Sequence, residues 1–130
     1  MVGLVIVSHS WKIAEGIVDL ALQMASDHKH IIAAGGLEDK EIGTDATRIM
    51  EAIKEANEGD GVVLLADLGS GVMSAETAIE LLEDEDIEVK LADAPIVEGA
   101  IAAAVEASTG GSVEEVIAAA EEARDSRKLS

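Results

Sequence analysis

The sequence predicts an α/β domain with a small, open, parallel sheet of four strands and helices on both faces. Short apolar runs rich in β-branched residues alternate along the chain with longer stretches in which apolar residues recur at helical spacing. Each predicted strand leads into the next helix through a short turn, as in parallel sheets with right-handed crossovers. The length of 130 residues suits one domain with a buried core, so we expect residues 1–130 to form a single domain.

Four apolar runs are predicted as strands, and their patterns differ. The first and third runs are continuous, as in strands that are buried on both faces of a sheet. The fourth run alternates apolar and charged residues, which is typical of an edge strand with one wet face. Gly35 and Gly36 end the second run. In chain order, the predicted strands cover residues 4–7, 29–34, 61–66 and 87–92.

Helical spacing of apolar residues predicts five helices between and after these strands. Ser10 and Thr44 are the predicted N-caps of the first two helices, and Ser112 and Glu115 form a capping box at the start of the last. The fourth helix, residues 97–107, is rich in Ala, which permits close packing. The predicted apolar faces are Ile13, Ile17, Leu20, Ala21 and Met24; Ala46, Ile49, Met50 and Ile53; Ala75, Ala78, Ile79 and Leu82; Ile101 and Val105; and Val116, Ile117 and Ala120.

The remaining segments are predicted to be irregular. Residues 37–43 form a charged loop, residues 83–86 form an acidic, solvated turn, and residues 124–130 form a frayed end. The last two helices exceed what a four-stranded sheet needs, which favours pairing with another subunit.

Composition argues against several classes of function. The formal net charge is −18 with only nine Lys and Arg residues, whereas nucleic-acid binding needs clustered basic residues. The chain has no Cys, which rules out disulfides, thiolate metal sites and a cysteine nucleophile and fits a reducing cytoplasm. No apolar stretch has the length of a membrane span. We therefore expect a cytoplasmic protein without a metal site, whose partners are neutral or basic proteins.

Two predicted turns carry the candidate functional residues. His9 follows the first strand, and Asp67 follows the third, ahead of Gly69, Ser70 and Gly71 at a helix start. If the two strands are neighbours, both turns open at the same edge of the sheet. A carboxylate that accepts a hydrogen bond from one imidazole nitrogen leaves the other free to attack, and helix-start N–H groups favour a phosphoryl group. These features fit a histidine that accepts and passes on a phosphoryl group, although ordinary turn residues would have the same spacing.

Other features of the chain weigh against competing sites. The chain lacks the P-loop, dinucleotide-binding, zinc-protease and serine-hydrolase motifs. The first strand is not followed by the acidic residues of a phospho-accepting aspartate domain. His28 and His30 lie at the amino end of the second strand, at the opposite edge of the sheet from His9, and we expect both to be surface residues.

Five short motifs, in order and spread over essentially the whole chain, resemble the phosphotransferase subunit of phosphoenolpyruvate-dependent dihydroxyacetone kinase. That subunit is similar to the mannose-class enzyme IIA domains of the bacterial sugar phosphotransferase system. Gly71, Val72 and Met73, which follow Ser70, resemble the dihydroxyacetone branch more than the sugar-transport branch. The motifs are residues 5–10, 34–36, 42–45, 67–70 and 94–100.

The resemblance implies a phosphohistidine relay without a cofactor. His9 would take a phosphoryl group from phospho-HPr and pass it to ADP in the nucleotide-binding kinase subunit, and the ATP formed would phosphorylate dihydroxyacetone on a third subunit. Asp67 would orient His9. A strand order of 2-1-3-4 and a homodimer are also implied, and, because the chain ends after one domain, a separate donor protein. The residues that would shape the pocket are Gly36, Leu68, Gly69 and Ser70.

Two alternatives remain open on the sequence. A mannose-class enzyme IIA for sugar uptake would require a membrane permease as partner, and a non-catalytic regulatory or binding module could have kept the same fold. The acidic surface suits a donor with basic residues around its histidine, but net charge alone would repel a nucleotide. The sequence also leaves open which nitrogen of His9 would carry the phosphoryl group.

Overall fold

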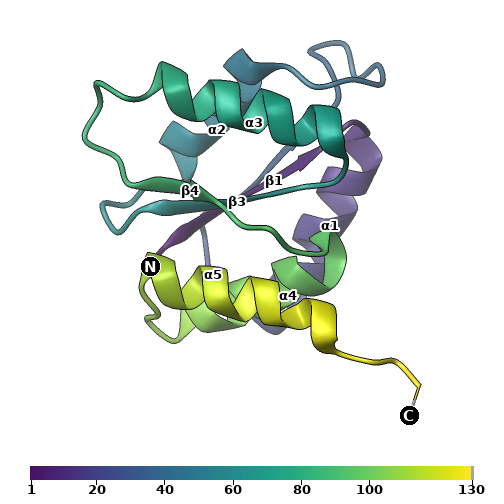
Figure 1. Cartoon of the computed structure of the whole chain (residues 1–130), viewed down its shortest axis with the longest axis vertical. Coiled ribbons are helices and arrows are strands. Elements are labelled where there is room, and N and C mark those ends of the chain that lie inside the picture. The colour runs from purple at the N-terminus through teal and green to yellow at the C-terminus, as the bar shows by residue number, and fades with distance from the viewer. Residues whose placement is uncertain (130) are drawn as a thin grey trace.

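A computed structural model describes residues 1–129 as a sheet between two layers of helices (Figure 1). All neighbouring strands are parallel, and their spatial order is β2-β1-β3-β4. The predicted α/β class, the strand order and the edge position of the fourth strand are confirmed. The strands are β1 (Gly3–Ser8), β2 (Ile31–Gly35), β3 (Val62–Ala66) and β4 (Val89–Leu91).

The helices divide between the two faces of the sheet. Helices α2 and α3 cover one face, and α1, α4 and α5 cover the other (Figure 1). No helix among residues 1–129 combines the length and apolar character needed to cross a bilayer. The helices are α1 (Trp11–Met24), α2 (Ala46–Ala56), α3 (Gly69–Leu81), α4 (Ile96–Ser108) and α5 (Val113–Glu122), and a 3₁₀ helix spans Ala123–Asp125.

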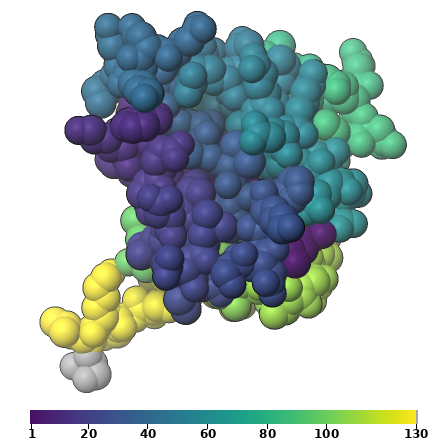
Figure 2. Space-filling view, turned by 180° about the vertical axis from the view of Figure 1, so that it is seen from behind, coloured from purple at the N-terminus to yellow at the C-terminus, as the bar shows by residue number. Residues whose placement is uncertain are grey.

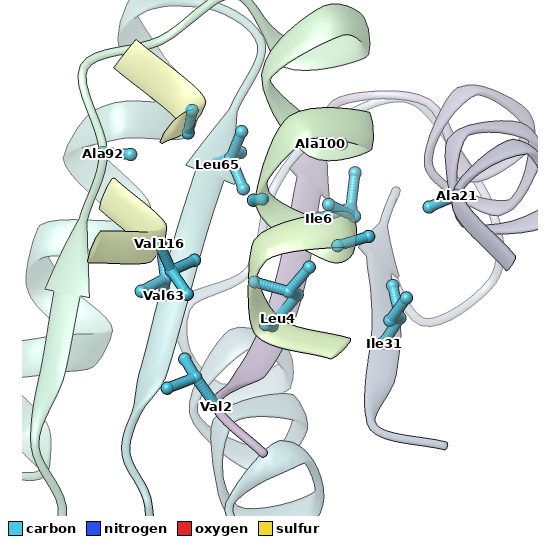
Figure 3. Packing of buried hydrophobic residues seen from close by; sticks show 14 of the residues in the cluster. Val2, Leu4, Ile6, Ala21, Ile31, Val63, Leu65, Ala92, Ala100 and Val116 are labelled. Carbon is cyan, nitrogen blue, oxygen red and sulfur yellow. The ribbon is translucent and has the colours of Figure 1, made fainter. Parts of the chain in front are cut away.

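Strand β1 lies at the centre of both cores and is buried along its whole length. Because side chains alternate along a strand, its residues contribute in turn to the two faces. Figure 3 shows Leu4 and Ile6 in the cluster that faces α1, α4 and α5. Full burial of each large apolar side chain contributes about 1.5–3 kcal/mol. The strand residues facing α1, α4 and α5 include Leu4, Ile6, Val63 and Leu65, and those facing α2 and α3 include Val5, Val7, Val62 and Leu64.

The prediction that the last two helices exceed what the sheet needs is wrong, because α4 and α5 are part of the core. Their buried residues pack against β1 and β3, beside α1. The prediction that Ile101 and Val105 form the buried face of α4 is wrong, because Val105 is exposed and Ile101 is only partly buried. The small residues allow the close approach, and the larger ones point outward. The buried residues of α4 are Gly99, Ala100, Ala103, Ala104 and Ala107.

The buried face of α1 also differs from the prediction. Ile13, Leu20 and Met24 are half or more exposed, at 50%, 50% and 62%. Ile17 and Ala21 are buried as predicted, but Ala14 and Val18 complete the buried face in place of Ile13, Leu20 and Met24. The residues that α1 buries are Ala14, Ile17, Val18 and Ala21.

Two predicted segment ends need correction. Asp45, and not Thr44, is the N-cap of α2, because its carboxylate accepts from the Thr47 N–H at 2.9 Å. The Thr44 hydroxyl instead bonds the Ser74 hydroxyl of α3 at 2.7 Å. The predicted frayed end begins too early, since Arg124 lies within the 3₁₀ helix and Lys128 pairs with Glu98. Ser130, also part of that prediction, lies outside the described residues.

His28 is buried, contrary to the prediction, and only 1% of it is exposed. Its Nε2 donates to the Val2 carbonyl at 2.8 Å, and its Nδ1 accepts from the His30 N–H at 3.1 Å. Burial is the main cause that holds the pKa of His28 below its ordinary value of 6.5, although the bond to Val2 opposes this effect. His30 is partly exposed and lies 3.4 Å from Glu58.

We predict that His28 makes the fold less stable below about pH 6.5. As pH falls through the unfolded-state pKa of about 6.5, the unfolded chain binds a proton that the folded chain resists, so the stabilisation present above this pH is lost. His28→Gln removes this titration and should flatten the decline in the free energy of unfolding, measured by urea denaturation at several pH values. The wild type and His28→Gln are compared at each pH, so that titrations common to both proteins cancel. Equal slopes in the wild type and His28→Gln would contradict the prediction.

Candidate active site

The carboxyl ends of β1 and β3 bring His9 and Asp67 together. Val7 of β1 pairs with Ala66 of β3, and the Asp67 N–H donates to the Val7 carbonyl at 3.1 Å. Both side chains are largely shielded, with 21% of His9 and 13% of Asp67 exposed. The two residues therefore meet at the edge of the sheet where neighbouring loops diverge.

Asp67 accepts hydrogen bonds from the imidazole and from its surroundings. Oδ1 lies 2.9 Å from His9 Nδ1 and accepts from the Leu68 N–H at 2.7 Å. Oδ2 accepts from the His9 N–H at 2.9 Å and from the Ser8 hydroxyl at 2.8 Å. Because an ionised carboxylate only accepts, Nδ1 carries the proton of the neutral ring. The lone pair is therefore on Nε2.

The same bonds keep Asp67 ionised. Burial alone would raise its pKa, but the hydrogen bonds from the His9 N–H, the Ser8 hydroxyl, the His9 ring and the Leu68 N–H outweigh this effect. The pKa of Asp67 is consequently below its usual value. The carboxylate can thus hold the tautomer of His9 at neutral pH and stabilise a positive charge on the ring.

Ser8 is a site residue that the sequence reasoning missed. It is fully buried at the end of β1, where its hydroxyl donates to Asp67 and accepts from the Ser10 N–H at 3.1 Å. This hydroxyl ties the carboxylate to the turn that carries His9. The available signal was a hydroxyl at the last position of an otherwise apolar, buried strand.

Nε2 of His9 faces the start of α3. The Ser70 hydroxyl is in hydrogen-bond contact with Nε2, and since Nε2 has no proton, the hydroxyl donates. The first backbone bond of this helix runs from the Val72 N–H to the Leu68 carbonyl at 3.0 Å. N–H groups in the first turn before Val72 are the ones that a helix leaves for an anion. Rotation of the Ser70 hydroxyl would uncover the lone pair and allow it to bond a phosphoryl oxygen.

Gly36 and Leu68 are two of the predicted pocket residues. Each makes a hydrogen bond to the His9–Asp67 region through its backbone N–H. The Gly36 N–H donates to the Ser8 carbonyl at 3.1 Å, and its φ of +69° suits glycine in the turn after β2. The Leu68 side chain is 64% exposed, while its N–H bonds Asp67. Gly69, the other predicted glycine of the pocket, begins α3, and a Cβ there would meet nothing within 4 Å.

The backbone of His9 is held on several sides. Its N–H is bonded to Asp67, and its carbonyl accepts from the Gly43 N–H at 2.9 Å. Ser10 caps α1 as predicted by accepting from the Ile13 N–H at 3.3 Å. The imidazole is therefore fixed before any partner arrives, which favours transfer by positioning.

The site contains an imidazole nucleophile and hydrogen-bond donors. Within residues 1–129, no three carboxylate or imidazole side chains converge as metal ligands would. A pocket of about 340 Å³ borders the Asp67 turn, between the ends of β3 and β4. Its lining includes Leu91 and Asp93 from the β4 side, so the carboxyl edge of the sheet is open beside the pair.

Comparison with known proteins places this geometry in a family. A family model described as EIIA-man, PTS system fructose IIA component, matches residues 3–117. The chain belongs to this family. The EIIA-man assignment agrees with the resemblance that the sequence motifs carry.

The chain is similar to subunits of dihydroxyacetone kinases from several bacteria. The chain is 46% identical over 132 residues to the phosphoryl donor subunit DhaM of PEP-dependent dihydroxyacetone kinase from Providencia stuartii, and the match covers 98% of the chain and 28% of that protein. It is 41% identical over 118 residues to DhaM of dihydroxyacetone kinase 2 from Listeria innocua, covering 90% of the chain and 94% of that protein. The chain thus spans little more than a quarter of the first relative and nearly all of the second.

A solved structure shares the EIIA-man fold of the chain over most of its length. The crystal structure of a protein of unknown function superposes with a TM-score of 0.80 at 33% identity. The superposition covers 94% of this chain and 95% of the other.

We predict that Gly71→Ala slows phosphoryl acceptance by His9. A Cβ at position 71 would lie 2.9 Å from Asp67 Oδ1 and 3.5 Å from His9 Cε1, so the orienting pair must shift. Because misplacement by about 1 Å can cost about 100-fold in rate, we expect a 10- to 100-fold loss measured by rapid-quench labelling. The thermal midpoint should stay close to that of the wild type, since Ala is the better helix former.

Gly16→Ala is the matched control for this experiment. It adds the same methyl group to a helix away from the site, at a position of α1 where a Cβ would meet nothing within 4 Å. Its labelling rate should equal that of the wild type. Equal rates for the two variants would mean that the His9–Asp67 geometry does not limit phosphoryl acceptance.

Proposed function

We propose that this domain relays a phosphoryl group through Nε2 of His9. The observation that carries the proposal is the 2.9 Å contact of Asp67 Oδ1 with Nδ1, which leaves the lone pair on Nε2. Membership of the EIIA-man family and similarity to phosphoryl donor subunits of a kinase support it. In this proposal residues 1–130 act as one relay domain.

The donor in this proposal is the phosphohistidine of HPr. The Nε2 lone pair attacks phosphorus, the Nε2–P bond forms, and the donor N–P bond breaks with its electron pair returning to the donor imidazole. The imidazole of His9 then carries positive charge, which Asp67 stabilises through Nδ1–H. Transfer between two histidines is nearly balanced in energy, so positioning is the main task of the domain.

The acceptor in this proposal is ADP held by the nucleotide-binding kinase subunit. A terminal phosphate oxygen of ADP attacks phosphorus, the new O–P bond forms, and the Nε2–P bond breaks with its electron pair returning to Nε2. The ATP formed then phosphorylates dihydroxyacetone on a third subunit. Ser70 and the first turn of α3 bond the phosphoryl oxygens during both steps.

We also propose a homodimer in the cytoplasm. The exposed apolar side chains along α1, Ile13, Leu20 and Met24, form a surface that a second copy could cover. Sedimentation analysis would test the assembly, and a monomer at micromolar concentration would contradict it.

The acidic surface suits a basic donor, since opposite charges speed encounter.

The relay is tested by labelling and discharge. The wild type, His9→Ala and Asp67→Ala are incubated with phosphoenolpyruvate, enzyme I and HPr, and intact mass and acid lability are measured. We expect one acid-labile phosphoryl group on the wild type, none on His9→Ala, and labelling of Asp67→Ala slowed up to about 100-fold because the ring is no longer oriented. Addition of the ADP-loaded kinase subunit should then move the label of the wild type into ATP.

The outcomes separate the relay from its two alternatives. Labelling of His9 that passes to a sugar-specific IIB protein, and not to ADP, would support the mannose-class enzyme IIA for sugar uptake. Absence of any labelling would support a non-catalytic module with the same fold.

A further inference from the structure

Arg48 is one of five Lys and Arg side chains that have no carboxylate partner among residues 1–129. The protein has nine Lys and Arg against 27 Asp and Glu residues, so a basic side chain has many acidic groups to pair with. Among residues 1–129, no carboxylate oxygen lies within 4.0 Å of the Arg48 guanidinium. Four of the nine have an ion pair: Lys54–Glu85, Lys90–Glu114, Arg124–Asp93 and Lys128–Glu98.

Arg48 lies at the sheet edge that presents His9. Its Nη2 donates to the carbonyl of Gly35, the last residue of β2, at 3.4 Å. Gly35 pairs with Ser8 of β1, the residue before His9. Arg48 follows the loop whose Gly43 N–H bonds the His9 carbonyl, and this loop adjoins the start of α1 on the surface (Figure 2).

The donors of this guanidinium are poorly satisfied. Nε is shielded from solvent and has no hydrogen-bond partner among the described residues. The bond from Nη2 is long, so little is lost if the side chain leaves Gly35. An unsatisfied buried donor on a charged group is costly, and a bound anion would supply the missing acceptor.

The chemistry of the site indicates which ligand this is. Ser70 and the start of α3 serve the phosphoryl group on Nε2 from the β3 side of His9. Arg48 lies on the β2 side of His9. A second phosphate on that side would need a positively charged partner there, because Ser70 and the start of α3 lie on the β3 side. A phosphohistidine donor brings one phosphoryl group, whereas a nucleoside diphosphate brings two phosphates to a chain with a net charge of −18.

We propose that Arg48 binds the non-reacting phosphate of the nucleoside diphosphate acceptor during discharge of phosphorylated His9. This inference rests on the proposed function. The planar guanidinium binds phosphate oxygens through two N–H groups and stays charged at any physiological pH. Arg48 thereby serves the acceptor half of the relay, while the donor half depends on the His9, Asp67 and Ser70 group alone.

The test measures the two half-reactions separately on four proteins. Wild type, Arg48→Gln, Arg48→Lys and Lys54→Gln are labelled with phospho-HPr, purified, and mixed in a single turnover with the ADP-loaded kinase subunit. Lys54→Gln is the matched control, because it removes one positive charge from the same helix at an ion pair with Glu85. Rapid quench gives the labelling rate, the discharge rate and the ATP formed.

We expect Arg48→Gln to be labelled at the wild-type rate and discharged about 10- to 100-fold more slowly, the effect of losing a charged hydrogen bond. Arg48→Lys should recover part of the rate, and Lys54→Gln should match the wild type. Added salt should slow discharge of the wild type more than that of Arg48→Gln, because the screened charge is absent from the variant.

Three results would overturn the inference. The first is an unchanged discharge rate in Arg48→Gln. The second is an equal slowing of labelling and discharge together with a lower thermal midpoint, which indicates a structural role. The third is labelled wild type that the ADP-loaded subunit fails to discharge, and this result alone would also remove the acceptor from the proposed function.

Discussion

The hydrogen bond between Asp67 and His9 Nδ1 is the interaction on which the site depends. Four donors converge on the two oxygens of one carboxylate, so its charge is retained and its orientation is fixed. A single acceptor thereby sets which nitrogen of the ring has a lone pair and where it points. Ser70 and the start of α3 lie on that side of the ring. In the proposed relay, a phosphoryl group therefore reaches Nε2 from the side of α3.

The fold makes this bond possible because it places β1 and β3 side by side. His9 and Asp67 are 58 residues apart in the chain, and only the pairing of two buried parallel strands joins them. Both central strands bury apolar side chains on both faces, so their ends cannot slide without exposing the core. Packing of ordinary Val, Ile, Leu and Ala residues therefore fixes the geometry of the two polar residues.

The spacing of apolar residues and the residues typical of turns predicted much of this arrangement from the sequence. The strand runs, the turns after them and the motif resemblance indicated the sheet, its order, and the candidate pair. In α4 the small Ala and Gly residues lie inside while Val105 lies outside. In α1 the buried face is turned toward Ala14 and Val18, which leaves Ile13 and Leu20 outside. A pattern of hydrophobic residues does not predict how closely a helix approaches the sheet, and that distance decides whether small or large side chains are buried. Likewise, the burial of His28 and the bonds of Ser8 to Asp67 and of Arg48 to Gly35 depend on contacts that the sequence alone does not show.

Identification of the phosphorylated nitrogen tests the central claim most directly. The chain labelled with ¹⁵N-histidine would be phosphorylated and its ³¹P–¹⁵N couplings and ring shifts recorded by NMR. The account requires phosphorus on Nε2 of His9, with Nδ1 still protonated and bonded to Asp67. Phosphorus on Nδ1 would contradict it, because the Asp67 carboxylate occupies that side of the ring.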